Sequence, residues 1–238
     1  LYDSFFNDQD RFRELYETAE RNTRLRKKSV PAIDLFSAFM EERKNTGRIY
    51  LMNVDHANDH SSFIASKAPI KQSNLCCEIN LPTKPLNDFN DEEGEIALCI
   101  LSAINVGTIK SLDDLEELCE LAVRALEEII DYQRYPIKAA EKSTKARRSL
   151  GVGYIGLAHY LAKNKANYAD KEAWKLVHDL TESFQYYLLK ASNKLAQERG
   201  ACEYFDRTKY SDGILPIDTY KADVDTIVEN KLNYDWDS

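Results

Sequence analysis

The sequence places an amide, a thiol and a carboxylate at alternate positions of one short segment. Asn74, Cys76 and Glu78 lie in the run Gln-Ser-Asn-Leu-Cys-Cys-Glu-Ile, which occupies residues 72–79. We expect this run to be extended, because Pro82 follows it and proline does not fit inside a helix. Side chains alternate between the two faces of an extended segment, so the three polar groups would share one face.

These three groups favour chemistry through a neutral thiol. A carboxylate beside a thiol disfavours the thiolate, because the two would carry like charges, whereas a nucleophilic thiolate needs a cation or a histidine nearby. No histidine lies close to Cys76 in the sequence. The arrangement therefore favours a thiol that exchanges a hydrogen atom, with Glu78 as general base on a substrate hydroxyl and Asn74 to orient that substrate. A plain strand with buried cysteines is the favoured alternative on spacing alone.

The other cysteines give no sign of a disulfide framework or of a zinc site. Cys77 would lie on the apolar face of the run as a small hydrophobe, which makes Cys76 the better candidate for the reactive thiol. Cysteines also stand at positions 99, 119 and 202, an irregular spacing that favours a reducing cytosol. His56 and His60 are four apart, but they lie in a polar stretch that we expect to be a solvated loop rather than a metal site.

Composition and charge exclude several classes of protein. The 238 residues carry 32 Lys and Arg against 40 Asp and Glu, a net charge of −8, which argues against a nucleic-acid surface or a polybasic membrane anchor. Apolar residues make up 43% and charged residues 30%, as in an ordinary globular protein. The chain begins at Leu1 rather than at a methionine, so we expect either a piece of a longer protein or a trimmed chain.

The first half of the chain combines helices with two apolar runs. Apolar spacing predicts a charged helix over 8–27 and a second helix that starts at Pro31 and stops at Gly47. Residues 48–52 favour a strand, and residues 53–72 a polar loop. The continuous apolar run 96–104 favours a strand covered on both faces, as in a parallel sheet or barrel, although a buried helix also fits.

The second half of the chain reads as helical. We expect a helix from Ser111, with Asp114 in a capping-box position and a core thiol at Cys119. Its apolar stripe would be Leu112, Leu115, Leu118, Ala122, Ala125 and Ile129. Residues 147–153 read as the entry into a helix that ends near Asn164. A long helix capped by Asp170 and stopped by Gly200 would use Trp174, Val177, Thr181, Phe184, Leu188, Ala191 and Leu195. A loop over 201–216 and a last helix over 218–230 would follow, and alternating strands and helices favour an α/β fold.

Long motifs across the chain resemble a known family. The run QSNLCCEINLPT at 72–83 continues as PLND at 85–88 and GEIALCILSAINVG at 94–107. These motifs resemble the large catalytic subunit of class I ribonucleoside-diphosphate reductase, in the form found in enteric bacteria and their phages. The likeness covers essentially the whole chain, through residues 46–50, 53–56, 147–153, 185–193, 199–202 and 213–221.

The resemblance implies a fold and an activity. The fold would be part of a helix-rich, ten-stranded α/β barrel, with an inserted finger loop at about residues 70–83. The amino-terminal nucleotide-binding cone and the carboxy-terminal half of the barrel would lie outside this chain. The activity would be radical-based reduction of ribonucleoside diphosphates to deoxyribonucleoside diphosphates. A non-catalytic assembly module of a reductase complex is the alternative.

The resemblance also implies roles for individual residues. Cys76 would become the thiyl radical that abstracts the 3′ hydrogen of the ribose, and Glu78 would take the proton of the 3′ hydroxyl. Asn74 would hydrogen-bond the substrate, and Leu75 and Cys77 would line the substrate site with these three. Cys99 would be one of two cysteines that reduce the 2′ position and end as a disulfide. Its partner would lie outside this chain.

One departure from the family stands beside the radical position. A hydrophobic residue is common in the family where this chain has Cys77, which would either lie buried on the back face or divert the radical.

Tyr186 and Tyr187 are expected to pack in a helix rather than to relay a radical. Cys119 and Cys202 match no catalytic position.

The expected partners also follow from the resemblance. They are the rest of the large subunit, a small radical-generating subunit, thioredoxin or glutaredoxin, and the ribonucleoside diphosphate. No cofactor is expected to bind this chain directly, because the radical would come from the metal centre of the small subunit. ATP and deoxynucleotide effectors would bind other segments. Neither nucleic acid nor a membrane is an expected partner, and the location would be the cytoplasm, of the host if a phage encodes the protein.

Overall fold

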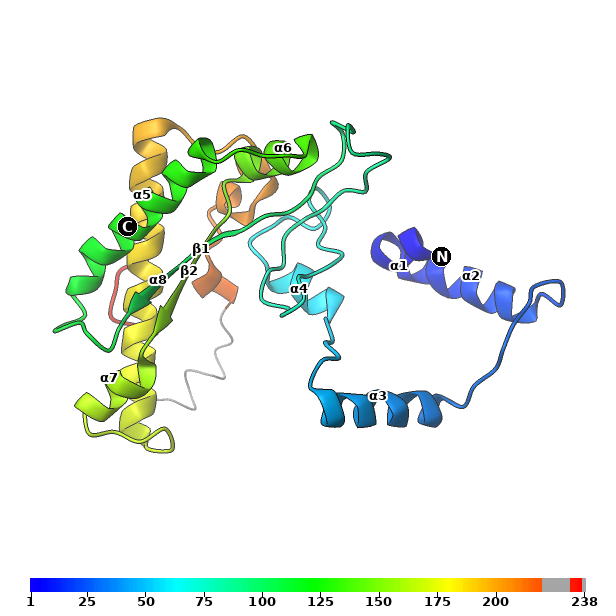
Figure 1. The fold of residues 1–238 in the computed structure, drawn as a ribbon, viewed down its shortest axis with the longest axis horizontal. Helices are drawn as coiled ribbons and strands as arrows, with labels where there is room; N and C mark the ends of the chain where they lie inside the picture. Colours follow the sequence, from blue (N-terminus) through cyan, green and yellow to red (C-terminus); the bar gives the residue numbers. More distant parts are fainter. Residues whose placement is uncertain (220–231, 237–238) are drawn as a thin grey trace. The chain divides into compact units, whose positions relative to one another are not determined.

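The computed structural model describes residues 1–219 and 232–236 and divides the chain into two units (Figure 1). The first unit is Leu1–Thr83 and the second is Lys84–Ser238. The helix expected over 218–230 lies almost entirely outside the described residues.

The first unit contains four helices, namely α1 (Tyr2–Asn7), α2 (Gln9–Arg21), α3 (Ala32–Thr46) and α4 (Val54–His60). Asp8 caps α2 by accepting a hydrogen bond from the backbone N–H of Arg11 at 2.9 Å. The helix predicted over 8–27 therefore begins where expected but ends early, at Arg21. The predictions for α3 are confirmed, because Pro31 precedes it and Gly47 ends it in the left-handed region, with φ 64°.

Two predictions for residues 48–72, which follow α3, are wrong. Residues 48–52 form no strand, because no other segment of the described chain pairs with them. The expected polar loop contains α4, whose Asn58 forms two hydrogen bonds with the backbone of Ile70. Its Nδ2 donates to the carbonyl oxygen of Ile70, and its Oδ1 accepts from the N–H, both at 2.8 Å. This side-chain bridge holds the backbone at Ile70 against α4.

The second unit is built on a parallel strand pair, which confirms the α/β class. Strand β1 (Ile100–Asn105) pairs with β2 (Leu150–Ile155), with Ile100 opposite Leu150 and Asn105 opposite Ile155. Helices α5 (Asp114–Tyr132) and α6 (Lys138–Arg147) make the crossover between the two strands. Strand β1 starts later than predicted, and its Leu101 is 60% exposed, so β1 is not covered on both faces by the described residues.

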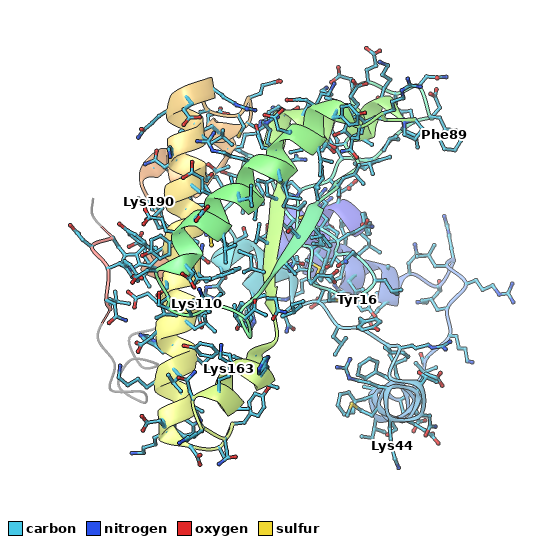
Figure 2. The ribbon with its side chains drawn as sticks, turned by 60° about the vertical axis from the view of Figure 1, so that its left-hand side comes forward. Tyr16, Lys44, Phe89, Lys110, Lys163 and Lys190 are labelled. Atoms are coloured by element: carbon cyan, nitrogen blue, oxygen red, sulfur yellow. The ribbon has the colours of Figure 1, made fainter. Side chains whose placement is uncertain are left out.

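Strand β2 and helix α6 were not predicted. Residues 147–153 were expected to open a helix, but β2 occupies 150–155 and only α7 (Leu157–Lys163) follows. Gly151 and Gly153 favour neither a helix nor a strand strongly, so the local sequence does not indicate the strand. Lys163, labelled in Figure 2, donates from α7 to the carbonyl oxygens of Gly107 and Ile109, at 3.2 and 3.0 Å. It thereby joins α7 to the loop that follows β1.

Helix α8 (Lys171–Arg199) runs beside α5 in the same direction (Figure 1). Ion pairs join the two helices at a constant spacing, from Lys190 to Glu116, from Lys194 to Glu120 and from Arg124 to Glu198. Figure 2 labels Lys190 on α8. Between the helices and the sheet lies the core, which contains Ile104, Val106, Leu115, Cys119, Tyr160, Leu161, Leu180, Phe184 and Tyr187.

The predicted apolar stripes were only partly correct. The buried face of α5 consists of Leu115, Cys119, Val123, Leu126, Glu127 and Ile130. Ile129, which the sequence places on the apolar stripe of α5, is 42% exposed. Trp174, which it places on the apolar stripe of α8, is 44% exposed. Both helices are apolar over a wide arc, so tertiary contacts rather than periodicity decide which residues face the core. In the described residues, α8 is followed by three short 3-10 helices, namely η1 (Phe205–Arg207), η2 (Lys209–Asp212) and η3 (Pro216–Thr219). None of the helices within the described ranges is long and apolar enough to cross a membrane.

Candidate active site

The segment that carries Cys76 is a tight turn rather than an extended run, so the predicted conformation is wrong. The carbonyl oxygen of Asn74 accepts a hydrogen bond from the N–H of Cys77 at 3.1 Å. This bond closes a four-residue turn whose central residues are Leu75 and Cys76. Cys77 itself has a φ of 62°, in the left-handed region. The alternation of side chains between two faces does not apply to a backbone that reverses here.

The turn nevertheless brings together the amide and the carboxylate that the sequence singled out. The Nδ2 of Asn74 donates to Oε1 of Glu78 at 2.5 Å. Its Oδ1 accepts from the N–H of Ile79 at 3.0 Å, so one side chain spans the turn. Ser73 adds a third bond, because its hydroxyl donates to the carbonyl oxygen of Ile79 at 2.9 Å. No pattern in the sequence predicts this role for Ser73, although it stands directly before Asn74.

The tip of this turn is open to solvent. Leu75 is 77% exposed, Cys76 is exposed, and so are Asn74 and Glu78. Cys77 is half-buried, so it fits neither a fully buried position on the back face nor a fully exposed one. A thiol at such a tip can reach a molecule placed against the turn.

Cys99 belongs to the second unit, where it stands one residue before β1. It is half-buried and precedes the strand instead of lying within it. A Cβ atom built on Gly151 of β2 would come within 2.9 Å of Cys99 Sγ and 2.5 Å of Leu101 Cδ2. Gly151 therefore leaves the room that the Cys99 thiol occupies. No local signal in the sequence points to this contact, because the sequence does not predict strand β2.

The segment that leads to Cys99 is anchored by a buried ion pair. Glu95 pairs with Arg147 of α6, and the side chains are 8% and 5% exposed. The backbone of Glu95 also exchanges two hydrogen bonds with that of Lys84, at 3.0 and 3.1 Å. Ser143 of α6 donates to the carbonyl oxygen of Ile96. These contacts hold the backbone on the approach to Cys99.

Cys119, Cys202 and the two tyrosines of α8 are wholly or partly buried. Burial raises the pKa of Cys119 to about 12, which confirms it as a core thiol. Burial also raises the pKa of Cys202. Tyr187 is buried, and Tyr186 stacks on Tyr234 with ring centroids 4.3 Å apart, so the prediction of a packing role is confirmed.

The two histidines of the predicted loop lie on a helix. His56 and His60 are on α4, with ring centroids 6.2 Å apart. Among the described residues, no group of three or more His, Cys, Asp and Glu side chains is arranged to hold a metal ion.

Comparison with known proteins gives the same family across the whole chain. The family described as ribonucleotide reductase, barrel domain, matches residues 2–238. The ribonucleoside-diphosphate reductase subunit alpha of Haemophilus influenzae is 58% identical over 238 residues, which are 100% of this chain and 32% of that protein. The ribonucleoside-diphosphate reductase 1 subunit alpha of Escherichia coli is 58% identical, over 100% of this chain and 31% of its own length. The ribonucleoside-diphosphate reductase subunit alpha of Enterobacteria phage T4 is 50% identical, over 99% of this chain and 31% of its own length.

The matched region includes both the turn and the strand pair. The chain spans about a third of the length of the curated relatives it matches. The match over residues 2–238 confirms the resemblance that the sequence motifs predicted. The helix-rich structure with its parallel strand pair agrees with part of an α/β barrel. The chain belongs to the ribonucleotide reductase barrel-domain family.

Proposed function

We propose that this chain provides the radical-bearing turn of a class I ribonucleoside-diphosphate reductase large subunit, which reduces ribonucleoside diphosphates to deoxyribonucleoside diphosphates. The observation that carries the proposal is the 2.5 Å contact between the Asn74 amide and the Glu78 carboxylate, across a turn that exposes Cys76. Three different functional groups thus lie on five residues of a chain that belongs to this family.

Each group has a defined task in the first half of the reaction. A thiyl radical on Cys76 takes the 3′ hydrogen atom of the ribose and becomes a neutral thiol. Glu78 accepts the proton of the 3′ hydroxyl through Oε2, since Asn74 holds Oε1. Asn74 fixes the Glu78 carboxylate in place before the substrate arrives. Positioning of this kind supplies much of the lowering of the activation free energy in enzymes.

Reduction at the 2′ position needs two electrons and two protons: one proton leaves with the 2′ hydroxyl as water, and the other ends as the new hydrogen on C2′. Cys99 and a cysteine from another part of the large subunit supply them by forming a disulfide, and the 2′ hydroxyl leaves as water. The radical then takes the hydrogen atom back from Cys76 to the 3′ position. A thioredoxin or glutaredoxin reduces the disulfide, and a small subunit supplies the radical at the start.

The test is substitution of Cys76 in the assembled reductase. Cys76→Ser removes the S–H bond, so we expect deoxyribonucleotide formation to fall to the background level. The control is Cys202→Ser, a half-buried cysteine outside the site, which should retain activity. Normal turnover by the Cys76→Ser protein would disprove the site assignment. Full assembly without turnover by the unaltered protein would instead favour the non-catalytic assembly module.

A further inference from the structure

We propose that Glu95 is a positioning residue for Cys99, held by a buried charge clamp that consists of Glu95, Arg147 and Arg207. The clamp fixes the backbone that leads into Cys99, and with it the direction from which the Cys99 thiol meets a second cysteine. This inference rests on the proposed function, which gives Cys99 its redox role. It makes the 2′ reduction, rather than the hydrogen transfer at Cys76, the half of the reaction that depends on Glu95.

The carboxylate of Glu95 lies between two guanidinium groups. Arg147 of α6 pairs with its Oε2, and Arg207 of η1 lies 3.6 Å from its Oε1. The side chains of Glu95 and Arg147 are only 8% and 5% exposed. Residues of this chain alone bury them, so the remaining parts of a large subunit are not needed to form the clamp. Hydrogen bonds between charged partners are the strong kind, so the carboxylate has one fixed direction.

Tyr204 holds the two arginines of the clamp. The guanidinium of Arg207 lies 3.5 Å from the centroid of the Tyr204 ring, and that of Arg147 lies 5.4 Å from it. Tyr204 is itself buried, and its N–H donates to the carbonyl oxygen of Ala146 at 3.0 Å. A planar guanidinium that stacks on a fixed ring has little freedom to move. The clamp therefore joins the segment before Cys99 to α6 and to the segment that follows α8.

Helix α6 also holds the backbone next to Glu95. The N–H of Ile96 donates to the carbonyl oxygen of Ala139 at 3.3 Å, and the carbonyl oxygen of Ile96 accepts from the hydroxyl of Ser143. Ala139, Ser143 and Arg147 follow one another at intervals of four residues, so they share one face of α6. Cys99 stands only three residues after Ile96. One face of α6 thus sets the backbone from which the Cys99 thiol projects.

Loss of the Glu95 charge would release this grip. Among the described residues, Nη1 of Arg147 has no hydrogen-bond partner, so the guanidinium depends on Glu95 for its charge partner. A buried charge without its partner is strongly unfavourable, so Arg147 would move towards water and take its face of α6 with it. Two cysteines form an unstrained disulfide only within a narrow range of geometry. Cys99 therefore needs a fixed backbone more than a residue that only fills space does.

The reduction potential of the Cys99 disulfide tests the proposal. It is measured in an assembled large subunit that contains this chain, against a dithiothreitol redox buffer and without substrate. In Glu95→Gln we expect the disulfide to be easier to reduce, by about tenfold in the equilibrium constant or about 30 mV, because a displaced cysteine forms a strained disulfide. In the assembled reductase we expect kcat to fall by about 10-fold to 100-fold while KM for the ribonucleotide is unchanged. A smaller folded fraction would lower kcat without moving the potential.

Two further variants separate position from stability. Glu95→Leu combined with Arg147→Met removes both charges, so no unpaired charge is left and the fold is retained, but the directed bond is lost. This double variant should show the same shift in potential. The control is Glu127→Gln, which breaks another largely buried ion pair, with Arg148. Arg148 keeps its two bonds to Asp131, at 3.1 and 2.7 Å, so the potential should not change.

The opposite outcomes are distinct. An unchanged potential in Glu95→Gln and in the double variant would overturn the proposal. An equal shift in Glu127→Gln would also overturn it, because the loss of any buried ion pair would then suffice. An unaltered subunit that forms no disulfide at Cys99 would disprove the redox role of Cys99 and this inference with it. Normal turnover by Cys76→Ser would instead disprove the radical assignment and leave the potentials standing.

Discussion

At the scale of single residues, Asn74 organises the turn more than any other side chain. Its amide bonds both the Glu78 carboxylate and the backbone of Ile79, so both ends of the side chain are used. An asparagine can do this because it carries a donor and an acceptor on one rigid group. The same amide therefore sets both the fold of the turn and the direction of the Glu78 carboxylate.

Replacement of Asn74 separates these contacts from the rest of the turn. Asn74→Ala removes both hydrogen bonds and frees Glu78, so we expect kcat/KM for nucleotide reduction to fall by about 100-fold. Ser73→Ala removes the hydroxyl that donates to the carbonyl oxygen of Ile79 at 2.9 Å and to Oδ1 of Asn74 at 3.3 Å. It leaves the bonds from Asn74 to Glu78 and Ile79 in place, so it should cost much less activity. Steady-state kinetics of the assembled reductase would measure both. Equal losses in the two variants would mean that Asn74 only shapes the turn.

Cys119 gives a prediction about pH. Burial raises its pKa from 9.0 to about 12, so the folded protein keeps this proton where the unfolded chain releases it. The unfolded state then binds fewer protons than the folded state between these values, and stability falls as the pH rises from 9.0 towards 12. We expect Cys119→Ala to be less stable at neutral pH but to lose stability less steeply above pH 9.0. Urea unfolding at several pH values measures the slope, and identical slopes would contradict the prediction.

At the scale of elements, the sequence predicted helices better than it predicted strands and turns. Caps such as Asp8 and Gly47 act locally, and both mark real helix ends. Strand β2 depends on pairing with β1, about fifty residues away, and its glycines carry no pattern of their own. The residues of the site were identified by type and by family resemblance. Their geometry could not be predicted, because a single positive φ at Cys77 converts an extended run into a turn.

Gly151 and Gly153 form a matched pair on β2. An added methyl at Gly151 would lie 2.9 Å from Cys99 Sγ and 2.5 Å from Leu101 Cδ2, whereas nothing lies within 4 Å of one at Gly153. Leu101 is exposed and can rotate away, so the methyl displaces the thiol. We expect Gly151→Ala to lower turnover by about 10-fold to 100-fold and to change the alkylation rate of Cys99, while Gly153→Ala changes neither. An unchanged alkylation rate in Gly151→Ala would show that Gly151 does not position Cys99.

At the scale of the whole molecule, the two units differ in how much they bury. In Leu1–Thr83 only Ala68, Ile70 and Pro82 are buried, among the described residues. Helix α3 buries none of its side chains, and its most exposed apolar residues are Ile33, Leu35, Phe36 and Met40. The second unit instead holds the core around α5 and α8. Burial of apolar surface is the main stabilising force, so the stability of this chain must be concentrated in the second unit.

Hydrogen exchange of the 238-residue chain tests this asymmetry. Amides of α5 and α8 should exchange only through global unfolding, because both helices pack on the core. Amides of α3 should exchange many-fold faster, since its hydrogen bonds open without exposing any buried side chain. When the rest of a reductase large subunit is added, we expect α3 to gain protection while α5 and α8 change little. Equal protection of α3 and α8 in the chain alone would contradict this account, because α3 would then be stabilised without a core.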